Sequence, residues 1–249
     1  MAIRPTTSFV SLESLWYGGN ILLSAAQNGW WRKSVILLLA LWAAFAHAEG
    51  SSQPSRIKEP ELRLELLSRD EADQQARTAI VAWLSVNGKG MTVNEADLSP
   101  EHLAEYQKLS GAIKKSDQEN TERLGEIIEK YGWPTKTLVG RDGSHAAWLL
   151  VQHADDNTKF QRKCLDLMTK LPHGEVSQSD VAYLTDRVLL AEGKKQIYGT
   201  QFTFSDAKWV PQTLEDEANV DKRRAEVGLP PLAEYVKSLE SVYGSAAKK

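Results

Sequence analysis

The sequence predicts a mainly α-helical single domain that carries a small two-stranded antiparallel β-hairpin. Two observations predict the helices over residues 59–243: apolar residues recur at spacings of three and four, and N-cap or proline signals precede several of these stretches. One observation predicts the hairpin, because the period changes to two over residues 195–204, ahead of a second strand over residues 208–214.

The amino-terminal residues 1–48 are typical of an export signal. Arg32 and Lys33 precede an uncharged apolar run that ends in the small-x-small sequence Ala46-His47-Ala48, and we expect cleavage after Ala48. The run is about a dozen residues long, well short of the roughly 20 that span a bilayer, so no stable membrane anchor is expected after cleavage. The chain is therefore expected to be periplasmic or secreted.

The stretch before Arg32 is long for a signal peptide, which suggests a misassigned start codon with the true start at Leu22 or Leu23. Amino-terminal sequencing of a precursor that retains earlier residues would contradict this. Residues 49–58 are rich in Ser, Gln and Pro and are expected to form a flexible linker, and residues 244–249 a frayed tail.

Removal of residues 1–48 makes the chain more acidic. It removes Arg4, Arg32, Lys33 and Glu13, so that 30 basic and 33 acidic residues become 27 and 32, a net charge of −5. An acidic chain argues against nucleic acid as a partner. The single cysteine forms no internal disulfide, so the fold must depend on an ordinary core. The oligomeric state is not indicated.

A first helix is predicted from Pro60 to about Leu84, because proline suits a first turn and apolar residues follow at helical spacing. Arg69, Asp73 and Arg77 fall inside this apolar stripe, and their spacing of four lets Asp73 pair with either arginine. The trio is either a charge ladder at the edge of a helix contact or part of a site.

A second helix is predicted from Pro100, after the N-cap Ser99. Gly111 and Ser116 are expected to break or kink it before a further helix that runs to about Tyr131. Asp117 and Asn120 extend the apolar stripe of that further helix and are expected to point inward. Capping of the helix start is the structural alternative for Asp117.

The next helix is expected to begin near Asp142 or Ser144, which can act as N-caps. Residues 146–151 are apolar around the whole circumference, which predicts a central, buried helix. Gln152 and His153 follow at its end. A histidine there is suited to proton transfer or metal binding, although a buried structural histidine is the alternative.

Ser177 is expected to cap another helix, on which Asp186 lies among apolar residues and needs a partner from elsewhere in the fold. Gly193 ends this helix, and one face of the following strand presents Gln196, Tyr198 and Thr200. Two last helices are predicted over residues 219–227 and 232–243.

Polar residues thus interrupt several apolar faces, and buried polar groups need partners, so they predict either a polar pocket or a buried network. In the catalytic interpretation His153 is the acid or base, oriented by Asp186 or Asp73, and water is the nucleophile. The expected substrate-binding residues are Gln152, Gln196, Tyr198, Thr200, Gln201, Asp117, Asn120, Arg77 and Arg187.

The ordered motifs of residues 62–235 resemble those of the bacterial domain-of-unknown-function family 6624. The resemblance implies no activity, because none is established for that family. The motifs are Asp73-Gln74 with Arg77, Asp117 with Asn120 and Arg123-Leu124, Gly132-Trp133-Pro134, Gln152-His153-Ala154-Asp155 with Phe160-Gln161, Tyr183-Leu184-Thr185-Asp186-Arg187, Gln196 with Tyr198-Gly199-Thr200-Gln201, and Arg224 with Gly228-Leu229.

Three functions remain open on the sequence. The first is a hydrolase that acts on a small polar substrate through a His/Asp acid–base pair and needs no cofactor. A variant of it binds a divalent metal through His153 and two of Asp73, Asp117 and Asp186, although no His-Glu-x-x-His spacing supports this. The second is a non-catalytic module that binds a small polar or cell-wall-derived ligand. The third is a structural polar network in a protein-interaction domain.

Overall fold

The computed structural model describes residues 57–88, 93–205 and 208–243. The expected signal peptide and start site, most of the expected linker and the expected carboxyl-terminal tail lie outside the described residues. Within the described ranges, no helix combines the length and the apolarity that crossing a membrane requires.

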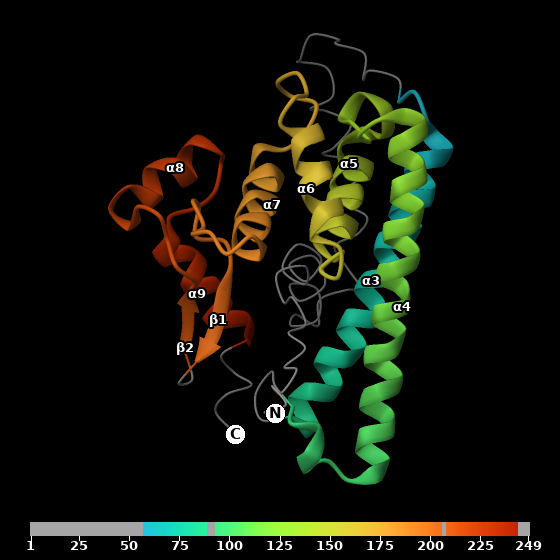
Figure 1. The fold of residues 1–249 in the computed structure, drawn as a ribbon, viewed down its shortest axis with the longest axis vertical. Helices are drawn as coiled ribbons and strands as arrows, with labels where there is room; N and C mark the ends of the chain where they lie inside the picture. The colour runs from blue at the N-terminus through green and yellow to red at the C-terminus, as the bar shows by residue number, and fades with distance from the viewer. Residues whose placement is uncertain (1–56, 89–92, 206–207, 244–249) are drawn as a thin grey trace, which may run out of the picture. The chain divides into compact units, whose positions relative to one another are not determined.

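The mainly α-helical fold class with a two-stranded antiparallel sheet is confirmed. Helices α3 (Pro60–Asn87) and α4 (Pro100–Tyr131) form a long antiparallel pair whose lower halves extend beyond the ends of α5 and α6 in Figure 1. A short 3₁₀ turn, Glu95–Asp97, precedes α4.

The predicted break near Gly111 or Ser116 is wrong, because α4 is one continuous helix. Its buried residues Tyr106, Ile113 and Asn120 follow one another at intervals of seven, so the same face stays against α3 through the glycine. Packing along this face outweighs the roughly 1 kcal/mol that a glycine costs inside a helix.

The central helix is α5 (Lys136–Gln152), which contacts α3, α4, α6 and α7, and the prediction that it is buried is confirmed. It begins earlier than expected, directly after the N-cap Thr135. Gly140, with a φ of 80°, divides it into two segments, and Asp142 accepts a hydrogen bond from the Gly143 N–H in the second. The expectation that Asp142 or Ser144 is the N-cap is therefore wrong, because the non-helical residue before the second segment is Gly140 and both residues lie inside the helix.

Helix α6 (Thr158–Met168), which the periodicity analysis did not predict, packs against α7 (Gln178–Ala191). Ser177 caps α7 as expected. A 3₁₀ turn, Glu217–Asn219, leads into α8 (Val220–Glu226), and α9 (Leu232–Tyr243) ends the described chain; both helices match the sequence prediction.

The sheet pairs β1 (Phe202–Ser205) with β2 (Lys208–Pro211), in the register Phe202 to Pro211 and Thr203 to Val210. Both strands are shorter than expected, because residues 195–201 form a loop and not an extended strand. Gly199 adopts a φ of 66° in this loop, a conformation that interrupts a strand.

Asp186 organises that loop. Its carboxylate accepts hydrogen bonds from the backbone N–H groups of Ile197, Tyr198 and Thr200 at 2.7–3.2 Å, and from the Thr200 hydroxyl. From the other side, Arg224 donates to the carbonyls of Tyr198 and Gly199. A buried carboxylate and a buried arginine thus replace the strand hydrogen bonds that the loop lacks.

Asp186→Ala is expected to lower the free energy of unfolding by about 3 kcal/mol, since one buried and two half-buried backbone donors lose their acceptor, and an unsatisfied buried donor costs about 1–3 kcal/mol. Urea denaturation of the native chain and the variant measures this. Asp166→Ala, at a half-exposed position on α6, is the control and should be nearly neutral. A loss below about 1 kcal/mol for Asp186→Ala would contradict the structural role.

Candidate functional site

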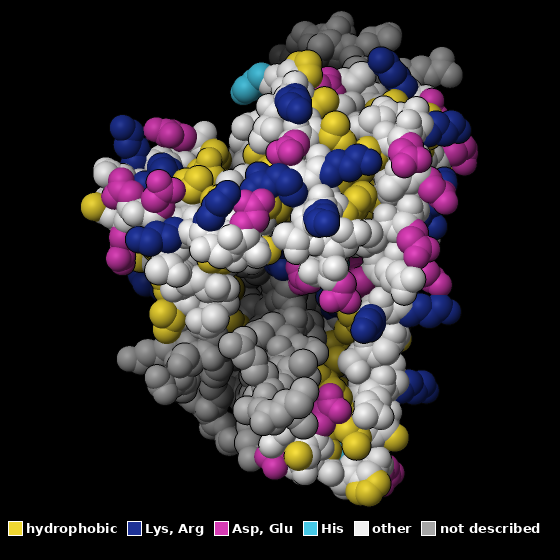
Figure 2. Space-filling view, viewed as in Figure 1, with side chains coloured by type: hydrophobic (Ala, Val, Ile, Leu, Met, Phe, Trp, Pro, Cys, Tyr) yellow, Lys and Arg dark blue, Asp and Glu magenta, His cyan; other side chains and the backbone are white. Residues whose placement is uncertain are grey.

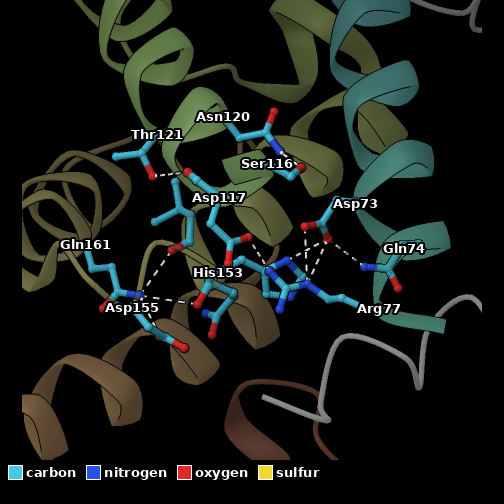
Figure 3. Close-up of polar contacts among 12 residues, drawn as sticks. Asp73, Gln74, Arg77, Ser116, Asp117, Asn120, Thr121, His153, Asp155 and Gln161 are labelled. Atoms are coloured by element: carbon cyan, nitrogen blue, oxygen red, sulfur yellow. Dashed lines mark hydrogen bonds and ion pairs between the residues drawn. The ribbon is translucent and has the colours of Figure 1, made fainter. Parts of the chain in front are cut away.

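Three helices bring four of the predicted residues to one buried centre, shown in Figure 3. Asp73 and Arg77 lie one turn apart on α3, Asp117 lies on α4, and His153 is the C-cap of α5. Asp73 and Arg77 fall on the buried stripe of α3 because they share the period of Leu66 and Ile80.

Asp73 is shared between two partners. Its Oδ2 lies 2.7 Å from Nδ1 of His153, a close polar contact that is not aligned as a hydrogen bond. Nε of Arg77 donates to both carboxylate oxygens of Asp73, at 3.1 and 3.2 Å. The Arg77 guanidinium also donates to Asp117 through Nη2. The side chains of Asp73, His153 and Arg77 are at most 4% exposed, whereas that of Asp117 is 24% exposed.

Burial and the neighbouring charges shift the pKa values of both Asp73 and His153. Burial alone raises the pKa of Asp73, but the contacts with His153 and Arg77 outweigh it and bring the pKa down to about 2. Burial, together with Arg77, lowers the pKa of His153, although Asp73 acts in the opposite direction. Near neutral pH the centre therefore holds an ionised Asp73 beside a neutral imidazole.

Asp117 titrates in a different range. Burial raises the pKa of its carboxyl group to about 7; Arg77 opposes the shift and Asp73 adds to it. Two carboxyl groups that share one arginine thus differ widely in pKa, which is typical of sites that carry out acid–base chemistry.

A second set of contacts fixes the end of α5 on which His153 lies. Gln161 donates through Nε2 to the carbonyls of Val151 and Gln152 and to Asp155, each at 3.2 Å. Arg187 donates to the side-chain oxygen of Gln152 and to Asp155, both at 2.7 Å. These contacts connect the α5–α6 turn to α6 and α7.

The centre opens into a pocket of about 700 Å³. Arg77, Asp117 and His153 line one part of it, together with residues 154–157 of the α5–α6 turn. No protein hydrogen bond is made to Nε2 of His153 within the described part of the chain. His153, whose Nε2 accepts no hydrogen bond from the described residues, thus lines a pocket large enough for a small ligand.

The same residues could hold a metal ion. Asp73, Asp117 and His153 each offer one ligand atom, and these atoms lie within 4.8 Å of one another. Carboxylate oxygens and imidazole nitrogens are common ligands of Zn²⁺ and Mn²⁺. Arg77 already pairs with both carboxylates, however, so an ion at this position would have to displace its guanidinium.

The other predicted residues lie elsewhere. Asp186 does not orient His153, because it binds the loop before β1, and Gln196 and Gln201 hold that loop through contacts of their own. Thr200 donates to Asp186, and Tyr198 is half-buried in the same loop. Asn120 accepts from Arg69 and donates to Ser116. Gln152 and Arg187 support the centre through Asp155, as described above.

The list of expected site residues omits Asp155 and Gln161. Helical spacing could have revealed Gln161, because it falls on the same stripe of α6 as the buried Cys164, Leu165 and Met168. Helical spacing does not mark Asp155, which looks like an ordinary helix stop, and only the family motif Gln152-His153-Ala154-Asp155 singles it out in the sequence.

A family model described as a family of unknown function, DUF6624, matches residues 60–248. Among the curated proteins no match is found. Among the solved structures no match is found either.

Stability should depend on pH through Asp117. Its pKa is near 3.9 in an unfolded chain and about 7 in the folded protein, so its stabilising contribution is lost as the pH rises between these values. Asp70, with a pKa raised to about 6, acts in the same direction, and His153, with a lowered pKa, acts in the opposite one.

Comparison with Asp117→Asn isolates the contribution of Asp117. Relative to the native chain, the variant should gain about 2–3 kcal/mol of stability between pH 5 and pH 8, because it lacks the carboxyl group whose ionisation burial opposes. Urea denaturation at the two pH values measures the gain. An equal difference between variant and native chain at both values would show that Asp117 titrates normally.

Proposed function

The chain belongs to the family of unknown function DUF6624, and we propose that it is a hydrolase that acts on a polar substrate through a His/Asp acid–base pair. The observation that carries the proposal is the close contact of His153 with Asp73 at the edge of a pocket. Of the two acids that the sequence left open, Asp73 is the one that orients the histidine in this reaction, and Asp186 is not.

In the proposed reaction, Nε2 of His153 takes a proton from a water molecule while the water oxygen attacks the electrophilic carbon of the substrate. The bond from that carbon to the leaving group breaks, and the leaving group receives a proton from the Asp117 carboxyl. Asp73 stabilises the imidazolium that forms, and the charge of Arg77 stabilises the developing oxyanion. The proton held by the His153 imidazolium then returns through solvent to the Asp117 carboxylate, so that the product acid and the protonated leaving group account for all atoms of substrate and water and both residues regain their starting states.

The pKa values support these roles near neutral pH. A lowered pKa leaves His153 free to accept a proton, and a pKa of about 7 leaves a substantial fraction of Asp117 able to donate one. The rate should therefore decline as the pH rises through about 7, because Asp117 loses the proton that the leaving group needs.

The expected amino-terminal signal supports a further proposal, that the protein acts in the periplasm or outside the cell, on a substrate available there. The acidic composition of residues 49–249 supports a small ligand over nucleic acid.

His153→Ala should reduce kcat by about 10²–10⁴-fold, the usual contribution of a general base. Hydrolysis by the native chain is first sought with p-nitrophenyl acetate, acetyl-p-nitroanilide and a p-nitrophenyl glycoside. His173→Ala, at an exposed position, is the matched control and should retain full activity. Binding of these compounds without turnover would favour the non-catalytic binding module. If the native chain neither binds nor hydrolyses any of them, both proposals are contradicted.

The cluster of potential metal ligands favours a second candidate, a metal-dependent hydrolase. Because Arg77 already pairs with both carboxylates, we expect elemental analysis of the purified protein to find well below one ion per chain. Arg77→Gln, which removes the competing cation, should bind Zn²⁺ more tightly than the native chain, and Arg77→Gln with Asp73→Asn should reverse the gain. One tightly held ion per native chain would instead support the metal-dependent reaction.

A further inference from the structure

The pocket extends well beyond the groups that would react. From Asp117 it continues along α4 to Tyr106, which is about 16 Å along the helix axis at a rise of 1.5 Å per residue. Pockets of 300–1,000 Å³ typically hold drug-sized ligands, so about 700 Å³ exceeds what a small polar group fills.

The chemistry of the lining changes along this length. Near the centre the lining is polar and charged, with Arg77, Asp117 and His153. Farther along, Ile80, Ile113 and Tyr106 of a buried apolar cluster line the pocket beside the polar side chains of Gln107, Ser110 and Lys114. Figure 2 shows hydrophobic side chains in the strip between the lower halves of α3 and α4. This end of the pocket would favour an apolar ligand by removing its surface from water.

Gly111 lies between the two ends of the pocket. A Cβ atom at this position would meet no other atom within 4 Å, and Gly111 lines the pocket. A larger side chain there would extend into unfilled space and not into the core. Any substrate that reaches from Asp117 to Tyr106 has to pass Gly111.

We propose that the pocket between Asp117 and Tyr106 binds an elongated alkyl or acyl arm of the substrate, whose polar head lies at His153. The inference rests on the proposed function for the position of the head but not for the binding of the arm. The substrate class is then an amphiphilic ester or amide, and Gly111 is the position that determines how long an arm the site accepts.

The test uses propionamide, hexanamide and decanamide, three neutral probes with the same head and different arms. Calorimetric titration of the full chain should show affinity that increases about fourfold for each added methylene, because each buried methylene contributes about 0.8 kcal/mol. Equal affinity for all three amides, or no binding of any, would overturn the proposal.

Gly111→Leu should remove the advantage of the longer amides and lower decanamide affinity at least tenfold, while propionamide binding stays unchanged. Gly125→Leu is the matched control, because Gly125 is also on α4, also has nothing within 4 Å of a Cβ, and does not line the pocket. If the two variants bind the series alike, the arm does not lie along α4 and the proposal fails.

The test separates this inference from the hydrolase proposal. His153→Ala should abolish hydrolysis yet retain the dependence of affinity on arm length, because His153 lies at the head of the pocket. A native chain that shows the arm-length series but hydrolyses no ester or amide would refute the hydrolase and leave the arm-binding pocket supported.

Discussion

The buried carboxylate of Asp73 is the interaction on which the rest of the centre depends. A carboxylate that is only 1% exposed is costly unless it is paired, and here Arg77 and His153 both contact it. His153 comes from α5, so α3 and α5 must pack at one particular rotation to bring the imidazole to Asp73. Arg77 then extends the same constraint to α4, because it also contacts Asp117. The Asp73 carboxylate and its partners thus constrain how α3, α4 and α5 pack against one another.

The molecule contains two polar clusters that serve different purposes. Around Asp186 the carboxylate is fully used by backbone donors of the loop before β1, so no oxygen remains for a ligand. Around Asp73, a histidine nitrogen has no protein hydrogen bond within the described residues, and one carboxyl group titrates near neutral pH. Buried polar groups with a structural role are usually fully hydrogen-bonded, whereas functional sites keep groups available for a ligand, and this difference is why we propose the Asp73 cluster as the site.

Helical periodicity identified Asp73 and Asp117 as inward-facing residues, because burial follows the 3.6-residue period of each helix. His153 was identified instead by its position at the end of a helix that is apolar around its whole circumference. Neither observation could pair these residues, since pairing depends on how separate helices pack. Asp186 illustrates this limit: its apolar neighbours predicted burial, but its partners are backbone groups of a loop that had been expected to be a strand. The continuity of α4 through Gly111 was also unpredictable locally, because contacts with α3 decide it.

Arg77 also determines which ligands the centre can attract. With Asp73 ionised, Arg77 charged and His153 neutral, the net charge is zero while Asp117 is protonated and −1 once it ionises above about pH 7. Below this pH a cation gains nothing from the centre as a whole, and a neutral polar head can bind without leaving a charge unpaired. Above it the centre attracts cations but has lost its proton donor. The proposed acid–base reaction would need a protonated Asp117, whereas metal binding would need an ionised one, so the protonation state of this one side chain separates the two candidate functions.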